Sequence, residues 1–129
     1  MGYKTHVTGE LAINPPLTWA EIKNSIFDPA DLSDSQNVML AITEERVDTD
    51  EGVLIRRTGT AIVSRWEESF KAYHLVEHVQ MAIDAFPDHE WTGRLECEGE
   101  ENTDVWRVIV RDRRAVKIEP RIVWPDEEA

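Results

Sequence analysis

Three short connections between apolar segments constrain the fold of this chain more than any other feature. Residues 48–52, 99–103 and 112–114 each separate two segments in which apolar and polar residues alternate. That alternation is typical of half-buried strands. Connections this short join antiparallel neighbours, because a parallel pair needs a crossover of a dozen or more residues. The pattern therefore argues against a parallel, doubly wound sheet.

Two segments have helical rather than strand character. Thr18 and Glu21 have the spacing of a capping box, and Leu17 and Ile22 that of a hydrophobic staple, so a short helix is predicted over about 19–25. A longer helix is predicted from about residue 71 to Phe86, because apolar residues recur there at helical spacing and Pro87 stops it.

The predicted element order is βαββαβββ. Strands are expected at residues 6–13, 38–47, 53–63, 90–98, 104–111 and 115–123, with Pro15 and Pro16 ending the first. This order predicts an α+β, two-layer sandwich: a mostly antiparallel sheet with two helices on one face, in ferredoxin-like order plus an extra C-terminal strand. The expected core residues are Leu11, Ile13, Ile22, Leu75, Val79, Ile83, Phe86, Leu95, Val108 and Ile118.

Length and composition predict one globular domain. The chain has 129 residues, enough to bury a core, and we expect a single domain over 1–124 with an acidic tail at 125–129. Segments 7–11 and 91–95 share the pattern Thr-Gly-x-Leu, which is too short to indicate an internal duplication.

Charge and cysteine content bear on partners and compartment. The chain carries 26 acidic and 14 basic side chains, for a net charge of −12. A field of this sign repels nucleic acid and anionic membranes, so the expected partner is another protein with a basic surface. The single cysteine, Cys97, excludes an internal disulfide, and no apolar run matches a signal peptide or a bilayer span. We therefore expect a cytoplasmic protein.

Four segments carry a family resemblance. TGELAINPPLTW, KAYHLVEHVQ, TGRLECEGE and PRIVWPD together resemble small acidic proteins of unknown function encoded by actinobacteria and their phages. The resemblance covers nearly the whole chain and implies one intact domain in a bacterial or phage-infected cell. It supplies no catalytic residue and no cofactor.

One short motif suggests metal chemistry. His74, Glu77 and His78 match H-x-x-E-H, in which two histidines on adjacent helical turns bind zinc and the glutamate is the general base. The chain ends soon after this motif, and Glu77 falls on the predicted wet face of the helix. Two histidines at the boundary of the apolar stripe are the simpler interpretation, and no metal or cofactor is expected.

An acidic segment is the main candidate for partner binding. It contains Glu96, Glu98, Glu100, Glu101 and Asp104. Alternate residues of a strand project from one face about 6.6–6.8 Å apart, so the first three could imitate a row of nucleic-acid phosphates. The alternative is a solvated strand end that keeps the sheet soluble. Trp66, in a polar connection, either folds back on the core or anchors an interface.

These features favour a non-enzymatic acidic binding protein, such as a phage or bacterial accessory protein that binds or inhibits another protein. Two alternatives remain open: a structural subunit of a phage or bacterial assembly, and a small zinc-dependent hydrolase that uses His74 and His78.

Overall fold

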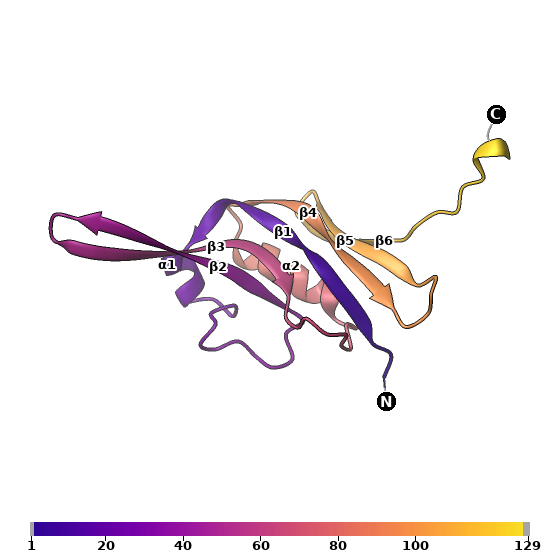
Figure 1. Cartoon of the computed structure of the whole chain (residues 1–129), viewed down its shortest axis with the longest axis horizontal. Coiled ribbons are helices and arrows are strands. Elements are labelled where there is room, and N and C mark those ends of the chain that lie inside the picture. The colour runs from indigo at the N-terminus through magenta and orange to yellow at the C-terminus, as the bar shows by residue number, and fades with distance from the viewer. Residues whose placement is uncertain (1, 128–129) are drawn as a thin grey trace.

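The computed structural model describes residues 2–127 and has the α+β architecture expected from the sequence (Figure 1). Along the chain, the elements are β1 (Thr5–Thr18), α1 (Trp19–Lys23), β2 (Val38–Thr49), β3 (Gly52–Ser64), α2 (Leu75–Ala85), β4 (Glu90–Gly99), β5 (Val105–Arg111), β6 (Arg114–Ile118) and a 3-10 turn at Pro125–Glu127. Of the expected acidic tail at 125–129, the last two residues lie outside the described part.

The strands form one sheet in the order β2-β3-β1-β4-β5-β6. Every neighbouring pair is antiparallel, so β1 and β2 run parallel to each other on either side of β3. This is a split βαβ arrangement for the first four strands. Two further strands, β5 and β6, extend the sheet beyond β4, which gives the six strands expected from the sequence.

Both helices contribute to one hydrophobic core on a single face of the sheet. Ile22 of α1 and Leu75, Val79, Ala82 and Ile83 of α2 are buried in the same cluster as the inward side chains of β1, β4 and β5. All the expected core residues are buried except Ile118, for which the prediction is wrong. Ile118 is half-buried opposite Arg107 on the outer face, the sheet face away from the helices.

The capping box that predicted α1 is present. The Thr18 hydroxyl oxygen accepts a hydrogen bond from the backbone N–H of Glu21 at 3.2 Å, and the Glu21 carboxylate accepts one from the Thr18 backbone N–H at 3.1 Å. The staple residues Leu17 and Ile22 are fully buried. Pro15 and Pro16 do not end β1. They fall within an irregular stretch, after which pairing with β3 resumes at Leu17.

Two irregularities change which side chains face the core. The β2–β3 ladder shifts between Ala41 and Ile42, so that Ile62 is fully buried, while Val63, which strict alternation from Gly59 would place inside, is half-exposed. A shift of one residue exchanges the two faces of a strand. At the other end of the sheet, β6 stops at Ile118 instead of continuing to 123, and Ile122 is 85% exposed.

The shared Thr-Gly-x-Leu segments lie opposite each other at the centre of the sheet. Leu11 pairs with Gly93, Gly9 with Leu95, and Glu10 with Arg94, so the two segments are related by a local twofold axis. Both glycines have positive φ, 85° and 96°, and both leucines are fully buried. The repeated pattern thus reflects one symmetrical strand pair.

The distal halves of β2 and β3 project from the rest of the molecule as a two-stranded ribbon, at the left of Figure 1. We call residues Glu44–Arg57 the arm and the rest of the molecule the body. The arm is anchored at its base by Arg57, whose guanidinium lies 5.3 Å from the centre of the Trp19 ring and whose Nε is 2.8 Å from Glu44 Oε1. Among the described residues, no helix is long and apolar enough to cross a bilayer.

Candidate functional site

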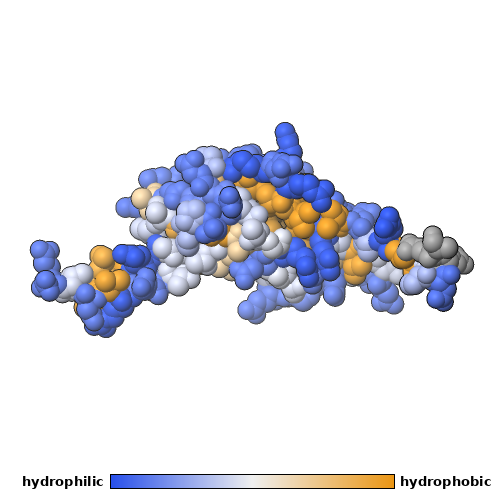
Figure 2. Space-filling view, turned by 90° about the horizontal axis from the view of Figure 1, so that it is seen from above, coloured by the Kyte–Doolittle hydropathy of each residue, from blue (hydrophilic) through white to orange (hydrophobic). Residues whose placement is uncertain are grey.

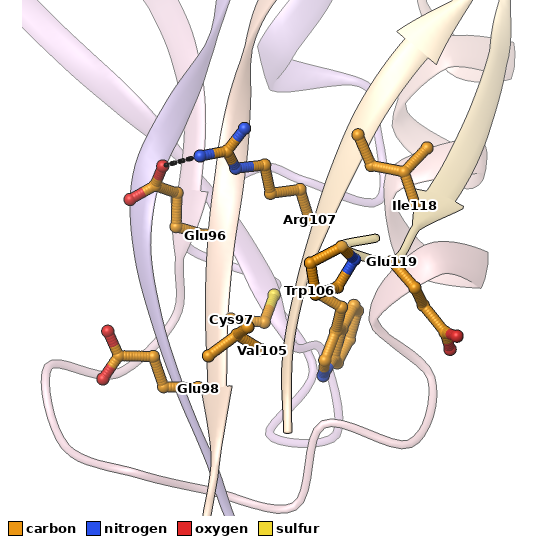
Figure 3. Close-up of a pocket in the computed structure, with 9 residues that line it drawn as sticks. Glu96, Cys97, Glu98, Val105, Trp106, Arg107, Ile118 and Glu119 are labelled. Carbon is orange, nitrogen blue, oxygen red and sulfur yellow. Dashed lines mark ion pairs between the residues drawn. The ribbon is translucent and has the colours of Figure 1, made fainter. Parts of the chain in front are cut away.

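Glu96, the first residue of the expected acidic row, is neutralised by neighbouring arginines. Its Oε1 lies 2.9 Å from Arg94 Nε and 3.3 Å from an amino group of Arg107, the ion pair drawn in Figure 3. Glu96 lies on the outer face of β4 opposite Arg107 of β5, so the second pair forms directly across the ladder. Glu96 therefore presents little free charge to a partner.

The acidic row breaks where β4 ends. Glu98 is exposed on the outer face of β4, but the strand stops at Gly99, and Glu100 already belongs to the following bend. The regular spacing that would imitate phosphates therefore does not extend over Glu96, Glu98 and Glu100. Only Glu98 and Glu100 of the three remain exposed acidic side chains without an ion pair in the described structure.

Asp104 and Glu101 shape the turn after β4. The hydroxyl of Tyr3 donates a hydrogen bond to the Asp104 carboxylate, and the backbone N–H of Glu101 donates to the same hydroxyl at 3.2 Å. The bond to Asp104 is the main reason that the pKa of Tyr3 lies above its usual value. Asp104 is half-buried by this contact, so its carboxylate fixes the turn, while the Glu101 side chain is exposed.

Glu98 and Glu100 meet two glutamates from a distant part of the chain. Together with Lys4, His6, Glu67, Glu68, Ser69 and Gly99, they line a shallow hollow of about 460 Å³, which we call the acidic hollow. Its three segments are held together by backbone hydrogen bonds between Thr5 and Phe70, of 2.8 and 3.0 Å, and by the contact of His6 Nε2 with the carbonyl oxygen of Glu67 at 3.0 Å. Four carboxylates surround one lysine and one histidine, which favours a cationic ligand.

Sequence reasoning missed Glu67 and Glu68 because they are some thirty residues before Glu98. Neither lies in a strand, and the contact that brings them to β4 is the isolated bridge between Thr5 and Phe70. The sequence did contain one signal for this site: Glu67 and Glu68 are consecutive acidic residues next to Trp66, a tryptophan that the sequence places neither in the core nor on the surface.

Trp66 flanks the acidic hollow but is not among its lining residues. Its ring packs against Phe70, with centroids 4.9 Å apart, and the guanidinium of Arg65 lies 5.6 Å from its centre. The side chain is half-buried. Trp66 thus supports the segment that carries Glu67 and Glu68 and retains some exposed aromatic surface.

A groove adjoins the acidic hollow on the outer face, and both include Glu98. This edge groove, of about 270 Å³, is drawn in Figure 3 and lies where the chain leaves the sheet after β6. It is lined by Glu96, Cys97, Glu98, Val105, Trp106, Arg107, Ile118, Glu119 and Pro120. Val105, Trp106 and Ile118 provide apolar surface, and Glu98 and Glu119 add a carboxylate on either side of Val105 and Trp106. The combination suits a ligand that carries both cationic and apolar groups.

Cys97 is no nucleophile in this setting. It is 1% exposed, and burial raises the pKa of its thiol to about 12. The thiolate that a nucleophile or metal ligand requires is therefore scarce near neutral pH. Cys97 packs as a small apolar side chain within the hydrophobic core.

The His74 and His78 motif has a structural explanation. His74 is the N-cap residue of α2 and lies 3.4 Å from Glu77, whereas Nδ1 of His78 accepts a hydrogen bond from the backbone N–H of Asn37 at 2.9 Å. Burial, reinforced by His74, lowers the pKa of His78. Among the described residues, no group of three or more His, Cys, Asp or Glu side chains could hold a metal ion.

A polar contact that the sequence did not indicate joins α1 to His89, the residue just before β4. His89 Nε2 lies 2.8 Å from the Glu21 carboxylate, and His89 Nδ1 lies 2.6 Å from the Pro15 carbonyl oxygen. Burial alone would raise the pKa of Glu21, but hydrogen bonds from His89 and Thr18 lower it overall. Glu21 and His89 lie beyond the end of the β1–β4 pair opposite to the acidic hollow, and their contact holds α1 in place.

Comparison with known proteins identifies a family but no function. A model of DUF6205, a family of unknown function, matches residues 1–129. No curated protein and no solved structure matches the chain.

Proposed function

Because the chain belongs to DUF6205, a family of unknown function, we propose from its own surface that it is a non-enzymatic binding protein that recognises a basic protein through the acidic hollow. The observation that carries this proposal is the convergence of Glu67, Glu68, Glu98 and Glu100 around Lys4 and His6. We further propose that it acts in the cytoplasm of a bacterial or phage-infected cell, as an accessory protein that binds or inhibits its partner.

The shape of the hollow favours a protein side chain over phosphate mimicry as the mode of recognition. A phosphate mimic presents carboxylates in a regular row, but here Glu96 is paired with arginines and Glu100 lies beyond the strand. Carboxylates gathered around a concave surface instead suit an inserted lysine or arginine, whose donors can reach several acceptors. The adjoining edge groove would take apolar residues next to that cation.

The proposal is tested by neutralising the hollow without changing its shape. In the quadruple variant, Glu67, Glu68, Glu98 and Glu100 are replaced by Gln. Partners are first captured from a bacterial lysate at low and high salt, and the association rate of the recovered protein is then measured. We expect the quadruple variant to associate on the order of tenfold more slowly at low salt, with a smaller difference at high salt, because charge steers the encounter.

A matched control carries the same change in net charge elsewhere. Asp31, Asp88, Glu90 and Asp126 are exposed and have no hydrogen bond or ion pair through their side chains in the described structure. Replacing them with Asn or Gln should slow association much less. An equal loss in both quadruple variants would show that only total charge matters, and the acidic hollow would not be the site.

A further inference from the structure

The outer edge of β2 has no partner strand within the described chain. β2 is the first strand in the sheet order, so β3 occupies only one of its edges. Along the arm this edge leaves backbone N–H and C=O groups facing solvent, which is the arrangement that templates pairing with another strand. The arm lies outside the body, so neither helix covers this edge (Figure 1).

The arm also exposes apolar side chains on both of its faces. Val53, Leu54 and Ile55 are 52%, 50% and 50% exposed, and hydrophobic atoms are visible on the projecting arm in Figure 2. Leu54 is opposite Val47 on one face, while Val53 and Ile55 are on the other. A two-stranded hairpin is marginally stable by itself in water, so further strands paired beside the arm would increase its stability.

The hairpin register determines which residues of β2 can accept a new strand. Thr49 pairs with Gly52 to close a two-residue turn. Hydrogen-bonded and non-bonded pairs alternate along an antiparallel ladder. Thr49 and Val47 therefore direct their backbone groups toward β3, whereas Asp48 and Arg46 direct theirs outward. A second strand can pair with this edge without a bulge only if the residues opposite Arg46 and Asp48 also direct their backbone N–H and C=O groups toward the new ladder.

Charge selects one register if the second strand is β2 of another copy. When the ladder is centred on Val47, Arg46 of each copy is opposite Asp48 of the other. The exposed contact between Arg46 Nε and Asp48 Oδ1 within one chain, at 3.5 Å, is then exchanged for two attractive pairs between the copies. Centring on Arg46 or on Asp48 places like charges opposite each other. Centring on Glu45 opposes two glutamates and competes for Glu44, which already binds Arg57 at 2.8 Å.

We propose that the arm is a self-association surface: β2 of one copy pairs antiparallel with β2 of a second copy, centred on Val47, to form a four-stranded ribbon. The contact is isologous, so a single patch serves both copies. Because the contact lies near the tip of each arm, the two bodies lie at opposite ends of the ribbon. Their acidic surfaces are thereby kept apart, and the net charge of −12 per chain does not prevent association.

Charge reversal tests this arrangement. R46D and D48R each replace the two attractive pairs with repulsive ones, so each variant should self-associate about tenfold or more weakly than the natural chain in sedimentation velocity. The decisive measurement mixes the two variants. One chain then carries Asp at 46 and 48 and the other Arg at both, and we expect a heterodimer at concentrations at which each variant alone is monomeric.

Two control variants distinguish an effect of charge within the arm from an effect of the net charge of the protein. Arg111 and Asp88 are exposed outside the arm, so R111D and D88R change the net charge by the same amounts and should leave self-association unaltered. A natural chain that stays monomeric at all concentrations would overturn the proposal. So would variants R46D and D48R that associate like the natural chain, or a mixture of the two that does not associate.

Discussion

The β1–β4 ladder and the arm are both antiparallel strand pairs with alternating sequence, yet they occupy opposite environments. In β1–β4, Leu11, Leu95 and Cys97 are at most 1% exposed because α2 covers one face. In the arm, Val53, Leu54 and Ile55 remain half-exposed because no layer lies over either face. Strand alternation therefore predicts the strand but not the layer that covers it.

Replacing one apolar residue by aspartate in each region should give the largest difference in the free energy of unfolding. Val79 of α2 is fully buried against the sheet, so V79D places an unpaired charge in the core and should cost about 4 kcal/mol or more, enough to unfold the protein. L54D in the arm should change stability by about 0.5 kcal/mol or less. Urea unfolding at low protein concentration measures both. A folded V79D protein would mean that α2 does not cover the sheet as described.

Replacing each of the three positive-φ glycines by alanine should destabilise the β1–β4 ladder more than the arm. An added Cβ at Gly9 would lie 2.5 Å from the Arg94 carbonyl oxygen, and one at Gly93 would lie 2.7 Å from that of Glu10. G9A and G93A should each cost about 2 kcal/mol or more, since backbone strain and a backbone clash combine. Gly52 in the arm has no neighbour within 4 Å of that position, so G52A should cost only about 1 kcal/mol. Thermal unfolding gives the ranking, and equal losses at all three would contradict it.

Thiol labelling distinguishes the two regions without unfolding either. Cys97 should resist a disulfide reagent in the native protein, because it is buried and its pKa is raised to about 12. A cysteine introduced by L54C should react at once and add one rapidly labelled thiol. Rapid labelling of native Cys97 would show that β4 opens far more readily than its burial implies.

Acid titration should reveal the smallest difference in stability, between the half-buried carboxylate of Glu21 and the exposed carboxylate of Glu44. The pKa of Glu21 is lowered in the folded state, so its contribution to stability is complete above its usual value of 4.5 and is lost as pH falls through the lower folded value. The stability gap between the natural chain and E21Q should therefore narrow below about pH 4.5. E44Q in the arm should show almost no gap, since the Glu44–Arg57 pair is exposed. Urea unfolding from pH 7 to pH 3 measures the three proteins, and a gap for E21Q that is constant with pH would contradict this.

The sequence was a good guide where the determinants are local. The Thr18–Glu21 spacing predicted α1 because both partners of the capping box are in one turn, and the stripe through Val79 and Ile83 identified the buried face of α2. The helix nevertheless begins at Leu75, four residues later than expected. Its N-cap, His74, makes no side-chain capping bond, so the sequence offered no marker for that boundary.

The sequence did not predict side-chain burial or site assembly correctly where these depend on contacts between distant parts of the chain. The shift that buries Ile62 instead of Val63 depends on the ladder between β2 and β3 and leaves no periodic trace in either strand. Ile118 is on the outer face because the register of β6 against β5 places it opposite Arg107. The acidic hollow was half-predicted: Glu98 and Glu100 are near each other in sequence, but Glu67 and Glu68 reach them only through the bridge between Thr5 and Phe70.

The position of β1 between β3 and β4 has a consequence for synthesis of the chain. Leu11 pairs with Gly93, so one edge of β1 remains vacant while the intervening segments are translated. The β2–β3 hairpin needs only neighbouring residues and can form early, whereas the centre of the sheet closes only after β4 has left the ribosome. Until then the nascent protein carries an open strand edge, and we expect the late closure of this long-range pair to limit the folding rate.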